Sequence, residues 1–307
     1  MHRFSVCKLV LAAGIATFAV SAQAAKVRGA GHGEDLLPTG KGWGERAGDG
    51  QAHKRSKTGA NNGIFYHGGP LLTNGANVYL IWYGNWSGNT ASTILTDLLQ
   101  SIGGSPYYNI NTSYYNADNV HVANSVTYAG SSTDDYSRGT DLGDSAVQGV
   151  VSGAITSGRL PNDPIGVYFV LTSADVKETS GFCTQYCGWH ARASIAGASI
   201  KYAFVGNPDR CPNACEEQTA SSPNGNPGAD GMASIIAHEL EEAVTDPNLN
   251  AWYDRRGQEN ADKCAWTFGA TSAADNGSLY NMVLGSRQYL IQRNWVNAAG
   301  GYCALSY

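Results

Sequence analysis

The sequence has few charged residues and, beyond its N-terminus, no long apolar run. Charged side chains make up 15% of the 307 residues, and the formal net charge is -5. So small a charge creates no field that would attract nucleic acid or an anionic membrane surface. No segment after residue 24 is apolar enough to be a membrane anchor. We therefore expect no nucleic-acid partner and no membrane span.

Two common catalytic motifs are also missing. The sequence has no Gly-x-Ser-x-Gly elbow, which argues against a Ser-His-Asp hydrolase. No glycine-rich phosphate loop stands before a predicted helix, which argues against nucleotide binding.

The N-terminus has the pattern of a secretory signal. Lys8 precedes an apolar run over residues 9–20, and residues 22–24 read Ala-Gln-Ala. This run is too short to span a bilayer, and the small residues fit a cleavage site. The pattern predicts a signal peptide over residues 1–24 and a secreted protein.

Residues 25–62 differ in composition from the rest of the chain. They are rich in Gly, Lys, Arg, Ser and Asn and have almost no aliphatic periodicity. Such a segment buries too little apolar surface to offset its ordering entropy, so we expect a flexible arm. A removable pro-segment is the alternative, because the basic residues 53–57 would suit a processing protease. The globular domain is expected over residues 63–307.

Six cysteines remain after the predicted signal peptide, and an even number in an exported chain predicts disulfides. They are Cys183, Cys187, Cys211, Cys215, Cys264 and Cys303. Proximity along the chain favours the pairs Cys183–Cys187, Cys211–Cys215 and Cys264–Cys303, because small loops close easily. A zinc site built from the two Cys-x-x-x-Cys pairs is the competing interpretation.

Apolar patterning predicts mixed strands and helices without a regular alternation, which favours the α+β class. The predicted strands cover residues 77–84, 165–173 and 201–206, and the predicted helices cover residues 90–102, 141–157 and 231–245, the last with Asp230 as N-cap.

The last of these helices carries a stripe of chemically active side chains. His238, Glu239, Glu242 and Asp246 fall on one face at 3.6-residue periodicity. Histidine and carboxylate at positions i and i+4 can bind one divalent metal ion, and Glu239 is placed to activate a metal-bound water. The alternative is that this stripe is only the solvated face of an amphipathic helix.

More acidic residues follow the helix within a short stretch of chain. Asp254, Glu259 and Asp262 come within reach of the same face, and repulsion among so many carboxylates is costly unless a cation or protons neutralise them. His190, beside the cysteine-rich segment, is either a further ligand or a hydrogen-bonded core histidine.

Several ordered motifs lie between Tyr66 and Cys303. They include Tyr66-His67-Gly68-Gly69-Pro70, Cys187-Gly188-Trp189-His190, Val205-Gly206-Asn207-Pro208 and the run Ala237-His238-Glu239-Leu240-Glu241-Glu242-Ala243-Val244-Thr245-Asp246-Pro247. Together they resemble the EXORDIUM, or phosphate-induced, family of secreted proteins. The resemblance implies an extracellular protein, in the apoplast or cell wall if the source is a plant or alga, linked to growth and cell expansion. It implies no established catalytic activity.

A weaker resemblance is to zincin metallopeptidases, whose helix reads His-Glu-x-x-His. It implies a zincin-like fold with His238 and Glu242 as ligands and Glu239 as general base. Asp246, Asp262 and His190 are the candidates for the third ligand. One divalent cation is expected, zinc first, with calcium or manganese as alternatives because carboxylates are harder ligands.

These resemblances leave two functional hypotheses. The first is an extracellular growth protein with an unidentified protein, peptide or cell-wall partner, and the alternative is a metal-dependent hydrolase that acts on peptide bonds.

Overall fold

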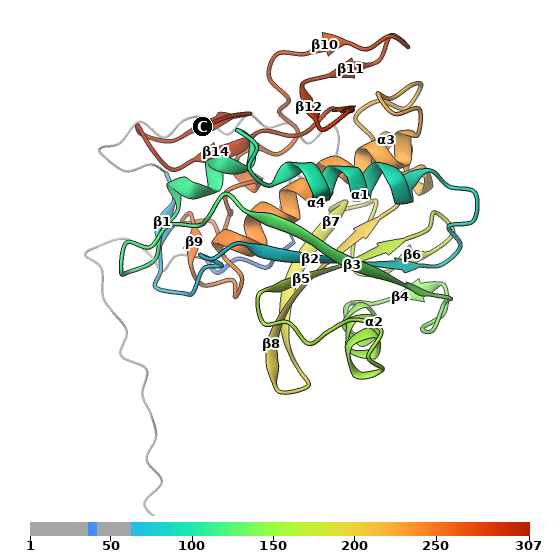
Figure 1. The fold of residues 1–307 in the computed structure, drawn as a ribbon, viewed down its shortest axis with the longest axis horizontal. Helices are drawn as coiled ribbons and strands as arrows, with labels where there is room; N and C mark the ends of the chain where they lie inside the picture. Colours follow the sequence, from blue (N-terminus) through green and yellow to red (C-terminus); the bar gives the residue numbers. More distant parts are fainter. Residues whose placement is uncertain (1–35, 42–62) are drawn as a thin grey trace, which may run out of the picture. The chain divides into compact units, whose positions relative to one another are not determined.

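The computed structural model describes residues 36–41 and 63–307, all of which belong to the compact unit Asp35–Tyr307 (Figure 1). The predicted signal peptide and most of the predicted arm lie outside the described residues. No described helix combines the length and the apolar character needed to cross a membrane.

A five-stranded sheet forms the centre of the fold, in the order β3-β2-β5-β8-β7. Its strands are β2 (Ala76–Tyr83), β3 (Val126–Asp134), β5 (Gly166–Thr172), β7 (Gly188–Ile195) and β8 (Ala198–Gly206). Four strands are parallel, and β7 runs antiparallel to β8 at the edge. Every residue of β5 is buried, as expected for a continuous apolar strand that is covered on both faces.

Helices cover both faces of this sheet (Figure 1). Helices α1 (Ala91–Ile102) and α4 (Pro227–Thr245) lie on one face, and α2 (Asp144–Thr156) lies on the other. This arrangement of helices and strands confirms the predicted α+β class.

Helix α4 is the central helix of the fold, and it begins four residues before the predicted start. Pro227 occupies its first turn, and the side chain of Asn226 accepts a hydrogen bond from the Ala229 N–H. The N-cap is therefore Asn226, and the prediction of Asp230 was wrong. Asp230 instead accepts hydrogen bonds from Ser222 and Asn224.

Short elements complete the fold, several of them in the C-terminal part of the chain. The paired strands are β1 (Phe65–Tyr66) with β9 (Trp252–Tyr253), β4 (Asp141–Leu142) with β6 (Lys177–Glu178), β10 (Ser272–Ala273) with β11 (Leu279–Tyr280), β12 (Met282–Leu284) with β13 (Arg287–Tyr289), and β14 (Asn294–Val296) with β15 (Tyr302–Ala304). The short helices are η1 (Tyr108–Ser113), η2 (Pro208–Arg210), α3 (Pro212–Cys215) and η3 (Asp262–Cys264).

The six cysteines among the described residues all form disulfides, but two of the three predicted pairings were wrong. Cys264 bonds to Cys303 as predicted, whereas Cys183 bonds to Cys211 and Cys187 bonds to Cys215. The last two bonds, which we call the double disulfide, join the segment that enters β7 to the segment that follows β8. Because β7 and β8 are antiparallel neighbours, these two segments lie side by side, and each cysteine meets one in the other segment. The cysteine zinc site is thereby excluded.

Part of the predicted arm lies among the described residues. Residues 36–41 contact the domain through main-chain hydrogen bonds to Arg255 and His190 and through an ion pair of Lys41 with Asp144. These contacts tie residues 36–41, which fall within the predicted arm, to the domain.

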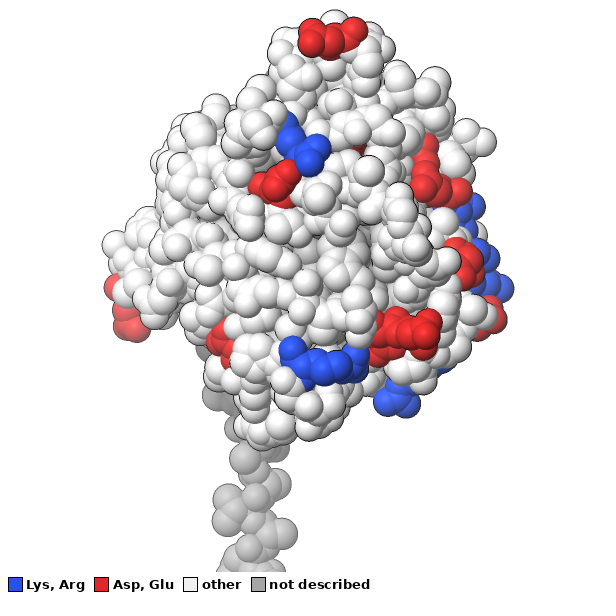
Figure 2. All heavy atoms as spheres, turned by 45° about the vertical axis from the view of Figure 1, so that its right-hand side comes forward, with Lys and Arg blue, Asp and Glu red and all other residues white. Residues whose placement is uncertain are grey.

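Charged side chains are sparse on the face drawn in Figure 2. Most lie singly or beside a group of opposite sign, with wide uncharged areas between them. This face therefore offers no continuous basic or acidic patch.

Candidate functional site

Six ionisable side chains meet between the edge strand β7, helix α4 and the chain around η3, and we call them the buried cluster. They are His190 from β7, His238, Glu239 and Glu242 from α4, and Glu259 and Asp262 from the segment that leads into η3. Each of the six is between 0% and 6% exposed. All of α4 from Gly228 to Thr245 is buried as well, so the interpretation of the stripe as a solvated helix face is wrong.

The ligand atoms of the cluster form two groups that share Glu242. In the first group, His238 Nε2 lies 3.2 Å from Glu242 Oε1 and 3.7 Å from Asp262 Oδ1. In the second group, His190 Nε2 lies 3.1 Å from Glu259 Oε2 and 3.7 Å from Glu242 Oε2. The two oxygens of Glu242 thus face different histidines.

Main-chain hydrogen bonds fix the orientation of two carboxylates. The Asp262 N–H donates to Glu242 Oε1 at 3.0 Å, and the Glu259 N–H donates to Asp262 Oδ2 at 3.0 Å. Asp262 therefore has one oxygen committed to the chain and the other directed toward His238. This positions the side chains before any ligand binds, as functional sites require.

A glycine on β7 makes room for Glu239. A Cβ atom at Gly188 would lie 2.5 Å from Ile235 Cγ2 and 3.1 Å from Glu239 Oε1. The carboxylate of Glu239 therefore packs directly against the backbone of the edge strand. Glu239 also contributes to the raised pKa of Glu259, which places its charge near the cluster.

Burial opposes charge on both partners of the His190–Glu259 contact. Burial, reinforced by the nearby imidazole of His238, lowers the pKa of His190 to about 3. Burial and the neighbouring carboxylates, Glu242 first among them, raise the pKa of Glu259 well above its usual value. Within the described residues, neither Glu259 nor Asp262 forms an ion pair with a lysine or arginine. In the part of the chain that the structure describes, no permanently charged cation therefore pairs with Glu259 or Asp262.

The structure brings together most of the predicted site residues, with two corrections. Asp246 is absent from both groups of ligand atoms. Its Oδ1 accepts the N–H groups of Asn250 and Ala251, each at 2.6 Å, and so closes the turn after α4. Glu259 takes part in its place. The sequence signalled Glu259 only as one of several acidic residues after the helix.

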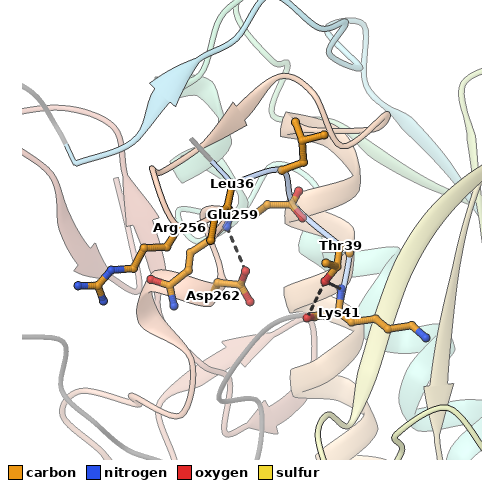
Figure 3. A pocket seen from close by; sticks show the side chains of 10 residues that line it. Leu36, Thr39, Lys41, Arg256, Glu259 and Asp262 are labelled. Atoms are coloured by element: carbon orange, nitrogen blue, oxygen red, sulfur yellow. Dashed lines mark hydrogen bonds between the residues drawn. The ribbon is translucent and has the colours of Figure 1, made fainter. Parts of the chain in front are cut away.

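A cavity of about 210 Å³ reaches the cluster from the side of the described N-terminal segment (Figure 3). Residues 36, 37 and 39–41 form one wall, and residues 256–258 with Glu259 and Asp262 form the other. Two carboxylates of the cluster thus line a cavity large enough for a small ligand.

The fold and the site define a disulfide-bonded α+β protein with a buried histidine–carboxylate cluster. The chain belongs to the EXORDIUM and phosphate-induced protein family, because residues 64–304 match the phosphate-induced protein 1 conserved region. It is similar to Protein EXORDIUM-like 3 of Arabidopsis thaliana, with 33% identity over 78% of this chain and 81% of that protein.

Two further relatives support this assignment. Protein EXORDIUM-like 5 of Arabidopsis thaliana is 33% identical over 75% of this chain and 74% of its own length. Protein PHOSPHATE-INDUCED 1 of Nicotiana tabacum is 29% identical over 63% of this chain and 68% of its own length. No solved structure matches the chain.

Proposed function

We propose that the buried cluster binds one divalent cation and that this EXORDIUM-family protein acts outside the cytoplasm as a metal-binding protein. The observation that carries the proposal is a pair of buried ligand groups, each with one imidazole and two carboxylates within ligand distance of one another, that share Glu242. Buried charges of one sign are stable only when they are paired, protonated or bound to a metal ion.

The spacing of the ligand atoms suits zinc. Neighbouring ligands of a tetrahedral zinc ion lie about 3.3–3.6 Å apart, because each Zn–N or Zn–O bond is 2.0–2.2 Å long. His238 Nε2 lies 3.2 Å from Glu242 Oε1 and 3.7 Å from Asp262 Oδ1, on either side of that range. Imidazole ligands favour zinc over manganese and calcium, which suit oxygen ligands, and calcium prefers six to eight of them.

A metal-dependent peptide hydrolase is the second candidate function. Glu239 follows the ligand His238 on α4, as the general base does in the zincin helix that this segment resembles. A bound cation would supply Lewis acidity to a water molecule, and in this proposal the Glu239 carboxylate would accept a proton from that water. The cavity beside Glu259 and Asp262 would admit the water.

Three disulfides and membership in this family support an extracellular location, since disulfides persist in oxidising compartments. We extend this to secretion through cleavage of the predicted signal peptide near residue 24. Mass spectrometry of the exported protein tests it, and a mature chain that begins at Met1 would contradict it.

Metal content tests the cation proposal. The protein is purified without chelator, incubated with zinc, manganese or calcium, dialysed and analysed by elemental mass spectrometry. We expect about one equivalent of metal in the unmodified protein and a loss of at least about tenfold in affinity in His238→Gln and Glu242→Gln. Glu241→Gln is the matched control, since Glu241 is also buried on α4 but bonds to Tyr107 instead.

Two measurements separate the outcomes. If the unmodified protein binds none of the three metals and a chelator leaves its melting temperature unchanged, the cation proposal is wrong. If metal does bind, the second measurement is cleavage of a mixed peptide library by the unmodified protein and by Glu239→Gln, which keeps all the proposed ligands. Cleavage that this substitution abolishes supports the hydrolase, whereas metal binding without any cleavage leaves a structural metal site.

A further inference from the structure

Residues 36–41 contact the outer edge of β7 near one end and the turn that contains Arg255 at the other. In the part of the chain that the structure describes, β7 pairs with β8 on one side only, and on its other side the His190 N–H donates to the Gly40 carbonyl at 3.0 Å. At the far end of the segment, the Leu36 N–H donates to the Arg255 carbonyl at 3.1 Å. Main-chain hydrogen bonds thus hold both ends.

The approach at Gly40 is too close for any other residue. Gly40 has φ +68°, and a Cβ atom there would lie 2.0 Å from the His190 carbonyl oxygen. The same segment ends in a turn in which the Thr39 hydroxyl accepts from the Lys41 N–H at 3.2 Å. This turn directs the Lys41 side chain away from Glu259 and Asp262, as Figure 3 shows.

The Lys41 side chain enters a site that is built for a cation. Its Nζ donates to Asp144 Oδ2 at 2.7 Å and to Ser180 Oγ at 2.8 Å. It also lies 5.3 Å from the ring centroids of both Tyr186 and Trp189, within the range of a cation–π contact. Partial burial raises the pKa of Asp144, but the hydrogen bonds from Lys41 and Ser180 outweigh burial and hold this pKa below its usual value.

Pro38 is buried in the middle of the segment, but the two leucines before it are not. Leu36 and Leu37 are 63% and 69% exposed, so its two largest apolar side chains contribute little to the core. The cavity of about 210 Å³ also remains open between this segment and residues 256–262. A core element would bury its leucines and close such a gap. The segment therefore contacts the domain in the manner of a bound peptide.

We propose that the edge of β7 at His190, together with the side chains of Asp144, Ser180, Tyr186 and Trp189, is a binding site for a peptide segment that carries a glycine followed by a lysine. Residues 36–41 are its built-in ligand. The main-chain bond at β7 selects glycine before the lysine, because no Cβ atom fits at Gly40, and the four side chains give preference for the cation. This proposal concerns binding alone, so it stands whether or not the buried cluster holds a metal ion.

Peptide binding in trans tests the proposal. The probe is a fluorescent, terminally blocked six-residue peptide with the sequence of residues 36–41, and the matched probe has norleucine in place of its lysine. In the unmodified protein the built-in segment competes at high effective concentration, so we expect the Lys41→Ala protein to bind the lysine peptide about tenfold more tightly. In that variant the norleucine peptide should bind about tenfold more weakly. A second change, Asp144→Asn, should remove most of this difference.

Hydrogen exchange at the His190 amide gives an independent measurement. Gly40→Ala should accelerate its exchange at least about tenfold by displacing the Gly40 carbonyl, whereas the control Leu37→Ala should leave it unchanged. Equal binding of the two peptides, no binding to the Lys41→Ala protein, or unchanged exchange in a folded Gly40→Ala protein would each overturn the proposal.

Discussion

Replacement of Asp246 by asparagine should change how stability depends on pH. Asp246 is fully buried at the end of α4, and its Oδ1 accepts two main-chain N–H groups. Burial outweighs these hydrogen bonds and raises its pKa from 3.8 to about 7. An asparagine carbonyl can accept the same two hydrogen bonds but stays neutral, so the substitution isolates the effect of the charge.

The direction and size of the effect follow from the pKa. Because the folded state favours the protonated carboxyl, its contribution to stability is complete below about pH 4 and is lost as the pH rises through about 7. For a single group with these two pKa values, the loss between pH 5 and pH 8 is about 2–3 kcal/mol. Asp246→Asn should lack this decline. The amide itself costs about 1–3 kcal/mol at every pH if its N–H₂ stays unbonded.

Urea unfolding at pH 5 and pH 8, with chelator present in both, measures this difference. We expect the variant to be less stable than the unmodified protein at pH 5 and to regain about 2–3 kcal/mol relative to it at pH 8. Parallel pH profiles for the two proteins would refute the reasoning, since they would show that the Asp246 carboxyl titrates alike in the folded and unfolded states.

Three further predictions concern a close backbone contact, a buried hydrogen bond and the disulfide pairing. Gly188→Ala should destabilise the protein by about 1–3 kcal/mol in thermal unfolding and displace Glu239, because the new methyl group overlaps α4. Tyr107→Phe should cost about 1–3 kcal/mol in urea unfolding by removing a donor to buried Glu241. Tyr108→Phe, the control, should be nearly neutral, because the Tyr108 hydroxyl has no hydrogen-bond partner among the described residues. Non-reducing peptide mapping should recover both bonds of the double disulfide, and two local loops in their place would contradict the structure.

The elements with a strong local pattern were predictable from the sequence. Residues 77–84 and 90–102 became β2 (Ala76–Tyr83) and α1 (Ala91–Ile102), because apolar periodicity reflects which face of each element is buried. The predicted start of α4 was four residues too late, because proline is favoured in the first turn of a helix and Pro227 occupies that position here.

The cysteine pairing required long-range information. Proximity along the chain favours bonds between cysteines four residues apart, but β7 was not predicted as a strand, so its antiparallel pairing with β8 was unknown. That pairing brings two cysteine-rich segments together. Loop-closure entropy decides between pairings only when the chain is free, and here the sheet fixes which sulfur atoms meet.

The candidate site shows the same division between local and distant information. His238, Glu239 and Glu242 share one turn of α4, so helical spacing alone placed them together. Glu259 and His190 come from segments that are distant in sequence, and only the fold shows that they contact each other. The solvated-face alternative also could not be excluded earlier, because burial of a polar stripe depends on what packs against it.

His190 belongs both to the buried cluster and to the peptide-binding edge. In a strand, the main-chain N–H lies in the plane of the sheet while the side chain projects from its face. The His190 N–H can therefore bond to Gly40 along the edge while its imidazole contacts Glu259 on one face of the sheet.

It follows that the buried cluster and the peptide-binding edge can be separated by substitution, although they share His190. His190→Gln should weaken metal binding and leave the main-chain bond to Gly40 in place. Gly40→Ala should break that main-chain bond and leave metal binding unchanged. Elemental analysis and hydrogen exchange on the same two variants test this, and a loss of both properties in both variants would show that the cluster and the edge form a single unit.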